Sequence, residues 1–442
     1  EGLPIDVRFM LPSCVPATPM DESGANLDYR AIDSFYDYPR VQGLAEMMNS
    51  YGVIHNDPEV VSKIVASQAH HKKIDGHAPG LQGKDLDTYV AAGVYSDHEC
   101  ATMEDALAKL QRGQFIMIRE GTAARNLEAL APLLTPQYAE RCMFCTDDKH
   151  PSDLLEKGHI DYIAREAINK YGVDPIIAVK AACHHASRYF LLNNRGAIAP
   201  GYLADFAVID NFKDFNVEMV FKKGILYWNN GELRDFEAPK IEEYLDKRAH
   251  DTFHVSTLTP DDFRDTRQRG VLGMVPGEII TTDNGYADHV DLEKDILKIA
   301  VVERHKGTHH IGLGYIQGYG LKSGAVATSI SHDSHNIIVV GTNSADMAFA
   351  ANYIVEHHGG IVVVENGTVK GDVVLEIAGI MSDRPLTEVN DQLEAAKDAA
   401  FTLGVSRGID PFMTLSFMAL PVIPKLRITT RGVIDVDTQQ YV

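Results

Sequence analysis

One pattern repeats six times in the first half of the chain: a short apolar run ends in a polar or Gly/Pro turn, and a helix-like stretch follows. The run ends are 21–33 residues apart. They fall near Ser13, Glu46, His77, His98, Arg119 and Asp147. A strand, a helix and two loops need about this length, so the pattern predicts consecutive βα units and a parallel sheet.

These six units span residues 1–195. A closed (β/α)₈ barrel needs eight units, and an open six-stranded sheet would expose two edges. We therefore expect an α/β fold with a TIM-like barrel, of which residues 1–195 supply strands 3 to 8. Two leading units are expected to be absent from this sequence or supplied by a separate segment. A doubly wound open sheet is the alternative, but no glycine-rich phosphate loop follows any of the strands.

The second half of the chain predicts two further parts. Residues 196–240 contain alternating apolar positions and the turn Asn229–Gly231, which favour part of a small β-sandwich. Residues 241–442 are expected to form an α+β C-terminal domain, in which a charged connector precedes strands from about residue 269. Its predicted features are a hairpin turn at Glu365–Thr368, a helix over Ala345–His358, and a helix that starts after Thr387 as N-cap and stops at Gly404.

Composition limits the partners. The 442 residues carry a formal net charge of −21, which argues against nucleic acid or an anionic membrane as a main partner. Five scattered cysteines do not predict a disulfide framework and fit a reducing cytoplasm. Cys142 and Cys145 have CxxC spacing, but on a buried strand they are interpreted as small core residues.

Four metal-capable side chains stand at the carboxyl ends of predicted strands: Glu46, His77, His98 and Asp147. That end of a (β/α)₈ barrel is where active sites form. Two imidazoles and two carboxylates without a thiolate suit Zn, Mn or Fe(II). Glu46 could bridge two ions, and Asp147 could both bind an ion and accept a proton. The sequence therefore predicts a metal site at this end of the sheet.

Several segments together carry a resemblance to a known family. The chain resembles the amidohydrolase superfamily and, within it, the adenine deaminases. The segments that carry this resemblance are Leu11–Thr18, Gly43–Asn49, Asp75–Gly80, Ser96–Glu99, Cys145–Asp148, Gly196–Gly201 with Ala204, Asp205 and Asp210, His332–Asn336 and Gly379–Asp383. They are spread over nearly the whole chain.

The resemblance implies hydrolytic deamination of adenine to hypoxanthine and ammonia, as in purine salvage or nitrogen use. It implies Glu46 as bridging carboxylate, His77 and His98 as ligands, and Asp147 as ligand and proton shuttle, with Asp148 as the alternative. The implied cofactors are two divalent transition ions, Mn or Fe(II), with Zn possible. It also implies a homo-oligomer. The family's His-x-His pair on the first strand is not found in this sequence.

A second acid is expected to protonate a ring nitrogen of the substrate, and Glu99 and Glu120 are the candidates. Further residues are expected to contact the substrate or to shape the site. They are Ser96, Asp97, Arg119, His332 and His335. For Ser96 and Asp97, a role in shaping the loop near His98 is the other interpretation. His332 and His335 could instead form a local polar turn.

Two alternatives to adenine deamination remain at this stage. One is another amidohydrolase that acts on a cyclic amide or purine analogue, although such enzymes usually carry a carbamylated lysine where this chain has Glu46. The other is a non-catalytic remnant that retains the fold and lacks the first-strand ligands. Metal content separates the remnant from the enzymes.

Overall fold

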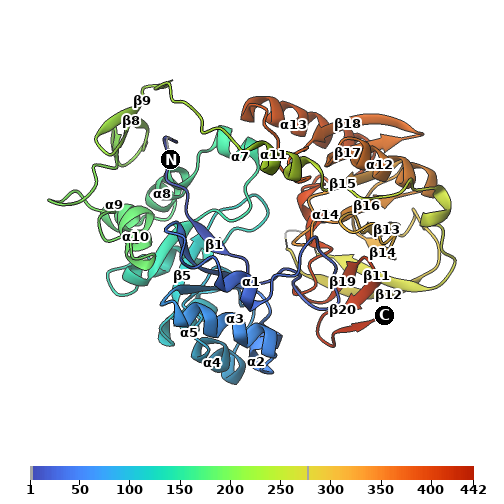
Figure 1. Cartoon of the computed structure of the whole chain (residues 1–442), viewed down its shortest axis with the longest axis horizontal. Helices are drawn as coiled ribbons and strands as arrows, with labels where there is room; N and C mark the ends of the chain where they lie inside the picture. The colour runs from blue at the N-terminus through green and yellow to red at the C-terminus, as the bar shows by residue number, and fades with distance from the viewer. Residues whose placement is uncertain (1–2, 276–277) are drawn as a thin grey trace. The chain divides into compact units, whose positions relative to one another are not determined.

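The computed structural model describes residues 3–275 and 278–442. The chain forms two compact units. Unit 1 contains residues 3–13 and Leu27–Lys240, and unit 2 contains Cys14–Asn26 and Ile241–Val442. Each unit has its own elements and core, and Figure 1 labels many of the helices and strands. Within the described ranges, no helix is both long and apolar enough to cross a membrane.

Six parallel strands of unit 1 follow one another in chain order. They are β1 (Phe9–Leu11), β2 (Val41–Met47), β3 (Lys73–Gly76), β4 (Ser96–Asp97), β5 (Phe115–Arg119) and β6 (Cys142–Cys145). The first three pair in parallel, as do the last three. A hydrogen bond of 2.9 Å from the Tyr95 N–H to the Ile74 carbonyl joins the two sets. The predicted succession of parallel strands is therefore confirmed.

Helices connect these strands or follow the last of them, and most of them bury apolar side chains. They are α1 (Tyr29–Asp33), α2 (Ser50–Ile54), α3 (Pro58–Ala69), α4 (Gly83–Ala91), α5 (Met103–Gln111), α6 (Leu127–Leu130), α7 (Pro151–Glu156), α8 (Ile160–Asn169), α9 (Pro175–Val179) and α10 (His185–Tyr189). Their starts follow ordinary capping rules: Asp57 caps α3 with Pro58 in the first turn, and Thr102 caps α5. One core forms around Leu44 and Ile74, and another around Ile116.

The apolar run that ends near His98 covers residues 91–95, and the prediction that this run forms a strand is wrong. Ala91 is the last residue of α4, and the strand that follows is only Ser96–Asp97. Helix α4 buries Leu86 and Tyr89 on one face. Ala91 is exposed and extends the helix, as the high helix propensity of alanine favours. Gly93 then takes a positive φ of 95°, which ends the helix and redirects the chain into β4.

Unit 1 also contains a four-stranded antiparallel sheet in the order β10-β9-β8-β7. Its strands are β7 (Phe206–Ile209), β8 (Val217–Lys222), β9 (Ile225–Asn229) and β10 (Glu232–Leu233). Asn230 and Gly231 connect β9 to β10, both at positive φ, as a two-residue type I′ hairpin requires. The predicted turn at Asn229–Gly231 is confirmed.

Unit 2 is built on an eight-stranded sheet in the order β12-β11-β14-β13-β16-β15-β17-β18. Its strands are β11 (Arg269–Met274), β12 (Thr281–Ala287), β13 (Ile296–Val302), β14 (Ile311–Gln317), β15 (Ala325–Thr328), β16 (Ile337–Gly341), β17 (Gly360–Glu365) and β18 (Thr368–Val374). The predicted hairpin turn at Glu365–Thr368 joins β17 to β18 and is confirmed. Three further strands, β19 (Leu426–Thr429), β20 (Gly432–Asp435) and β21 (Gln440–Tyr441), form a small separate sheet.

Alternation along the central strand β13 separates two cores. Leu297, Ile299 and Val301 belong to one core, whereas Ala300 and Val302 belong to the other. Successive side chains of a strand point to opposite faces, so the two cores lie on opposite faces of the sheet. Helix α12 (Ser344–Glu356) packs into one core and helix α13 (Leu386–Thr402) into the other.

The helix predicted after Thr387 begins earlier than expected. Helix α13 starts at Leu386 with Pro385 as its N-cap residue, so Thr387 lies inside the first turn and is not the cap. A proline fits this position because it presets its own φ without needing a hydrogen bond. The predicted stop is confirmed, since the helix ends at Thr402 and Gly404 has a φ of 105°.

The segment Cys14–Asn26 leaves unit 1 after β1 and packs within unit 2. Its Asp21 accepts a hydrogen bond from the Ser334 hydroxyl, and its Glu22 contacts His310 and Arg431. Burial raises the pKa of Asp21 to about 6, and the bond from Ser334 opposes that rise. The predicted barrel range of residues 1–195 includes this segment, so the chain is less cleanly divided than its sequence indicates.

The close approach of β3 to β4 generates a stability prediction. A Cβ on Gly76 would lie 2.1 Å from the carbonyl oxygen of Ser96. We expect Gly76→Ala to lower the free energy of unfolding of unit 1 by about 3 kcal/mol, the upper end of ordinary overpacking costs. The single tryptophan, Trp228, lies in β9 of unit 1, and its fluorescence in urea measures the change.

Gly408→Ala is the control substitution. The nearest atom to a Cβ there is 3.7 Å away, and Gly408 is exposed. We expect a change below about 0.5 kcal/mol, as for other surface substitutions. Equal unfolding midpoints for Gly76→Ala and the parent chain would show that β3 and β4 can separate at little cost.

Candidate metal centre

Titratable side chains meet at the carboxyl ends of the parallel strands of unit 1. Glu46 is the penultimate residue of β2, His77 directly follows β3, and His98 directly follows β4. Arg119 is the last residue of β5, and Asp147 comes two residues after β6. Because the strands are parallel, all five side chains start from the same edge of the sheet.

Both imidazoles lie between two carboxylates. The Oε2 atom of Glu46 is 3.2 Å from Nδ1 of His77 and 3.1 Å from Nε2 of His98. On the other side, Oε1 of Glu99 is 3.3 Å and 3.1 Å from the same two nitrogens. The two rings are edge to face, with centroids 5.5 Å apart.

The metal-capable atoms form two overlapping groups. One contains Glu46, His77 and His98, and the other contains His98, Glu99 and Asp147. Within each group these atoms lie within 4.8 Å of one another. The structure thus brings together all four residues predicted as metal ligands, and it adds Glu99. Asp147, rather than Asp148, joins the cluster.

Arg119 holds the two carboxylates on the far side of the cluster. It binds Glu99 through two hydrogen bonds of 2.5 and 2.9 Å, and it is 2.5 Å from Oδ2 of Asp147. The guanidinium is buried, and its positive charge is balanced by these two carboxylates. A direct contact with substrate, predicted for Arg119, stays a prediction.

The backbone of Asp147 has a positive φ of 57°, a conformation that aspartate tolerates better than most residues. Its Oδ1 accepts a hydrogen bond of 2.9 Å from the Asp148 N–H, so the side chain folds back over its own turn. The side chain remains 34% exposed, whereas that of Glu99 is 5% exposed. Asp147 is therefore the carboxylate of its group that a molecule from solvent can reach.

The charges in the cluster shift the pKa of its groups strongly. Burial by itself would lower the pKa of His77, but Glu99 and Glu46 raise it to about 9. The pKa of His98 is raised well above its usual value, because Glu46 and Glu99 outweigh burial in the same way. Burial would raise the pKa of Glu99, but His77 and His98 hold it well below its usual range. The cluster therefore stabilises positive charge between its nitrogens and oxygens.

These residues fit a divalent transition ion. The Nε2 atom of His77 is buried and has no hydrogen-bond partner among the described residues. Imidazole and carboxylate are the ligand types that Zn, Mn and Fe(II) share. A divalent ion would supply positive charge at the place where protons on the histidines supply it in the absence of metal. Glu46, His77, His98 and Asp147 could hold such an ion, with Glu99 beside them.

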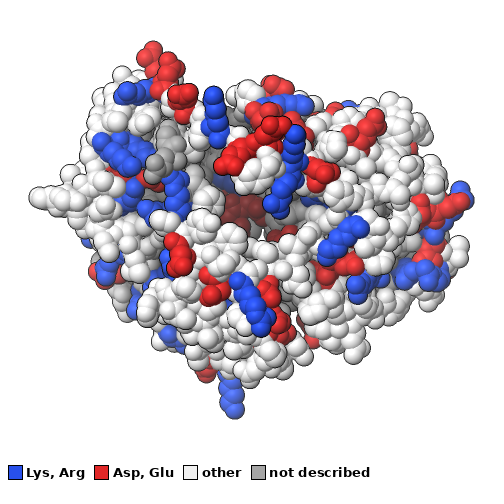
Figure 2. All heavy atoms as spheres, in the orientation of Figure 1, with Lys and Arg blue, Asp and Glu red and all other residues white. Residues whose placement is uncertain are grey.

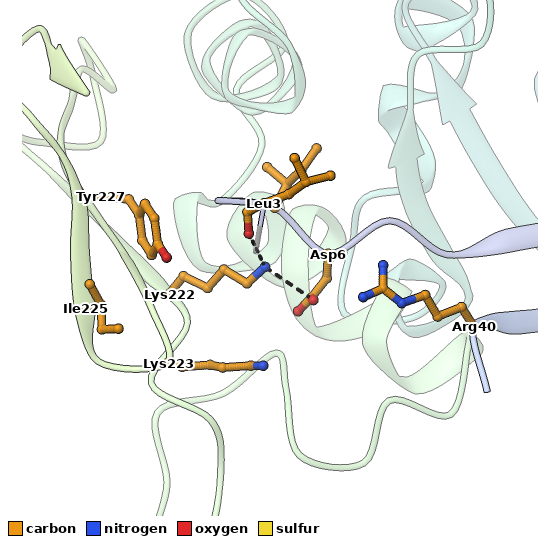
Figure 3. A pocket seen from close by; sticks show the side chains of 8 residues that line it. Leu3, Asp6, Arg40, Lys222, Lys223, Ile225 and Tyr227 are labelled. Atoms are coloured by element: carbon orange, nitrogen blue, oxygen red, sulfur yellow. Dashed lines mark hydrogen bonds and ion pairs between the residues drawn. The ribbon is translucent and has the colours of Figure 1, made fainter. Parts of the chain in front are cut away.

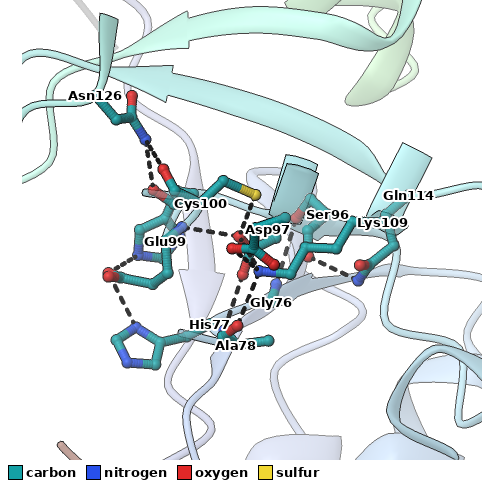
Figure 4. A network of polar contacts seen from close by, with 12 residues as sticks. Gly76, His77, Ala78, Ser96, Asp97, Glu99, Cys100, Lys109, Gln114 and Asn126 are labelled. Carbon is teal, nitrogen blue, oxygen red and sulfur yellow. Dashed lines mark hydrogen bonds and ion pairs between the residues drawn. The ribbon is translucent and has the colours of Figure 1, made fainter. Parts of the chain in front are cut away.

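Buried polar groups hold the strand ends in place (Figure 4). The Tyr89 hydroxyl accepts a hydrogen bond of 2.9 Å from the His77 N–H and donates one of 2.7 Å to the Met47 carbonyl. Asn126 donates to the His98 carbonyl at 3.2 Å and accepts from the Arg119 N–H at 2.8 Å. Sequence reasoning missed Tyr89 and Asn126, because nothing in their spacing connects them to the strand ends.

Ser96 and Asp97 are both buried below the cluster. Ser96 donates a hydrogen bond of 3.1 Å to Asp75, and Asp97 accepts hydrogen bonds from the Ala78 and Glu99 N–H groups at 2.8 and 2.9 Å. These contacts support the loop-shaping role expected for them. Asp97 has no exposed surface, which is unfavourable for the substrate contact that was the other expectation.

The remaining predicted residues lie outside the cluster. Glu120 accepts a hydrogen bond of 3.2 Å from the Leu127 N–H at the start of α6, and burial raises its pKa. His332 and His335 belong to unit 2, with ring centroids 6.0 Å apart. The His332 ring stacks on Phe417. Their roles toward a substrate stay predictions.

A separate pocket of about 240 Å³ lies at the other end of the strands (Figure 3). Its Arg40 directly precedes β2, and its Asp6 precedes β1. Lys222 contributes an ion pair of 3.2 Å with Asp6. None of the predicted site residues lines this pocket. The candidate metal site therefore lies at the carboxyl ends of the strands and not in this pocket.

Comparison with known proteins agrees with this site. The amidohydrolase family model matches residues 1–226, and the adenine deaminase C-terminal domain model matches residues 278–440. The fold and the site thus define an amidohydrolase, which confirms the predicted barrel class over a doubly wound sheet.

Two curated relatives are similar along the whole chain. One is the adenine deaminase of Desulfatibacillum aliphaticivorans, 44% identical over 450 residues that cover 100% of this chain and 78% of the relative. The other is the adenine deaminase of Nitratidesulfovibrio vulgaris strain DP4, 44% identical over 455 residues with the same coverage. The chain belongs to the adenine deaminase family, as its motifs predict.

Likeness to solved structures is low. A β-aspartyl dipeptidase from Fervidobacterium islandicum AW-1 is 16% identical with a TM-score of 0.37, covering 46% of this chain and 62% of that one.

The raised pKa of His77 generates a prediction for the metal-free protein. The unfolded pKa is about 6.5 and the folded one about 9, so the stabilising effect is full below pH 6.5 and is lost as pH rises through 9. We expect the urea midpoint of chelator-treated protein, followed by Trp228 fluorescence, to fall between pH 6.5 and pH 9.5.

His77→Gln should reduce that pH dependence, because one titrating imidazole is gone, and the contribution of His98 should remain. Added metal should also reduce it, since histidines bind metal in their neutral form. Equal pH dependence in the parent chain and His77→Gln would contradict a raised pKa at this position.

Proposed function

We propose that this chain catalyses the hydrolytic deamination of adenine, which gives hypoxanthine and ammonia. The observation that carries the proposal is the convergence of Glu46, His77, His98 and Asp147 on one cluster in a chain of the adenine deaminase family. The family assignment supports the reaction, a hydrolysis at a C–N bond. The cluster supports a metal-dependent mechanism, because its nitrogen and oxygen atoms stabilise positive charge between them.

We propose two divalent transition ions as cofactors, Mn or Fe(II), with Zn possible. The two overlapping groups of ligand atoms support two neighbouring ions, and the absence of thiolate from these groups fits this choice. A divalent ion in this site would act as a Lewis acid and make water more acidic. Glu46 and Asp147 would hold the ions through carboxylate oxygens, and His77 and His98 through ring nitrogens.

Asp147 is proposed to move the proton. Its carboxylate would take a proton from the attacking water and deliver it to the leaving amine. Its side chain is partly exposed, and burial raises its pKa while the charges of His98 and Arg119 act in the opposite direction. A carboxylate in this balance can both accept and release a proton. Arg119 would keep Asp147 in one orientation.

The acid that protonates the substrate ring remains a choice between Glu99 and Glu120. Glu99 has a pKa far below its usual range and is bound to Arg119, so it is expected to stay ionised. Glu120 has a raised pKa, which suits an acid, although its carboxylate is occupied by the Leu127 N–H. By its raised pKa Glu120 is the better proton donor, although it lies outside the cluster, and Glu99 is assigned to the charge balance of the site.

The partners follow from charge and chemistry. The proposed substrate is a neutral purine, and lysine and arginine side chains are scattered among acidic ones over the face shown in Figure 2. With a net charge of −21, this distribution favours a small-molecule substrate over nucleic acid. A homo-oligomer and a location in the cytoplasm stay predictions.

Ammonia release tests the proposal. We expect the protein purified with manganese to carry divalent metal and to release ammonia from adenine but not from adenosine, and a chelator should stop the release. Hydrolysis of a cyclic amide without release from adenine would instead indicate another amidohydrolase. Protein that takes up no metal and releases no ammonia would be the non-catalytic form.

Asp147→Asn tests the proton transfer. The amide cannot accept the proton, so we expect turnover to fall by at least about 100-fold, the lower range for general acid–base catalysis. Asp148→Asn is the matched variant, because Asp148 lies outside both ligand groups. It should keep most of the activity. Trp228 fluorescence in urea checks that both variants remain folded. The reverse pattern of activities would assign the role to Asp148.

A further inference from the structure

A fully buried ion pair joins helix α5 to strand β4. Nζ of Lys109 lies 3.0 Å from Oδ2 of Asp97, and neither side chain has exposed surface. Removing two charges from water is costly, and a buried pair is often no more stabilising than apolar residues of the same volume. The contacts of this pair therefore need an explanation beyond stability.

The carboxylate of Asp97 connects two strand ends. Its Oδ1 accepts the Ala78 N–H at 2.8 Å, and its Oδ2 accepts the Glu99 N–H at 2.9 Å (Figure 4). Ala78 directly follows His77, and Glu99 directly follows His98. One rigid group thus binds the peptide next to each histidine. No regular ladder pairs β3 with β4 at this point, so the carboxylate replaces the missing sheet hydrogen bonds.

Lys109 completes the connection from the other side. Its ammonium donates to the Ala78 carbonyl at 2.8 Å, to Asp97 at 3.0 Å and to Asp105 at 3.1 Å. These are all three of its donors, so the group has one well-defined position. Asp97 thus binds the N–H of Ala78, and Lys109 binds its carbonyl oxygen. Helix α5 therefore anchors the end of β3 through this pair.

We propose that Asp97 and Lys109 are positioning residues that set the spacing between His77 and His98 for metal binding. The inference rests on the proposed function of this site as a metal centre. Neither residue touches the ligand atoms, and both act through the backbone. Metal sites require their ligands within about 0.5 Å of the productive geometry, and losing outer-shell support costs about 10–100-fold in metal affinity or activity.

Metal affinity of the full chain tests the proposal. Co(II) binding is measured by competition with a chelator, together with its d–d absorption spectrum, for the parent chain, Asp97→Asn and the double variant Asp97→Asn/Lys109→Met. The double variant removes both charges of the pair. It also takes Lys109 away from Asp105, whose side chain is 11% exposed. We expect about 10–100-fold weaker Co(II) binding and an altered spectrum in both variants. Excess metal should restore kcat for adenine, with KM unchanged.

Asp346→Asn is the matched control. Asp346 in unit 2 is also buried and also accepts two backbone N–H groups, from Asn366 and Gly367 at 3.2 and 2.8 Å. Its substitution should leave Co(II) affinity unchanged. An equal loss of Co(II) affinity in this control would show that the Asp97 variants act by general destabilisation, and it would overturn the inference.

Two other results separate this inference from the proposed function. If the parent chain binds Co(II) and both Asp97 variants bind it as tightly, the positioning role is wrong while the metal centre stands. If the parent chain binds no Co(II), Mn or Zn, the proposed function fails, and the positioning role fails with it.

Discussion

Two imidazoles between two carboxylates form the interaction on which the site depends. Glu46 and Glu99 lie on opposite sides of His77 and His98 at hydrogen-bonding distance. Carboxylates so close together repel each other unless positive charge lies between them. Protons on the histidines supply that charge in the absence of metal, and a divalent ion would supply more of it. The preference of the cluster for a cation thus follows from Coulomb attraction in a largely buried place.

The scaffold brings this charge together through backbone geometry. Parallel strands end at the same edge, so residues separated by 21–33 positions become neighbours. The strands here are short, and β4 has only two residues. Their ends therefore rely on buried side chains for hydrogen bonds, chiefly Tyr89, Asp97, Lys109 and Asn126. Precision of the site comes from these groups as much as from the sheet.

Much of the architecture could be predicted from the sequence because it depends on local periodicity. The apolar runs located five of the six parallel strands, and the Asn-Gly pairs located two hairpin turns. Where helix and strand propensities overlapped, the prediction was wrong: residues 91–95 contain alanines that α4 could incorporate. The path of Cys14–Asn26 was also out of reach, since its contacts in unit 2 join residues about 300 positions apart.

For the site, the sequence alone determined which residue types stand at the strand ends, and their positions predicted Glu46, His77, His98 and Asp147 as neighbours. Only the tertiary structure decided which of the remaining polar residues belong to the cluster and which lie outside it. It placed Glu99 in the cluster and Glu120 against α6, and it directed Arg119 toward two carboxylates. The physical reason is that strand order follows from short-range pattern, whereas the direction and protonation of a buried side chain depend on every charge and hydrogen bond that the folded chain brings to it.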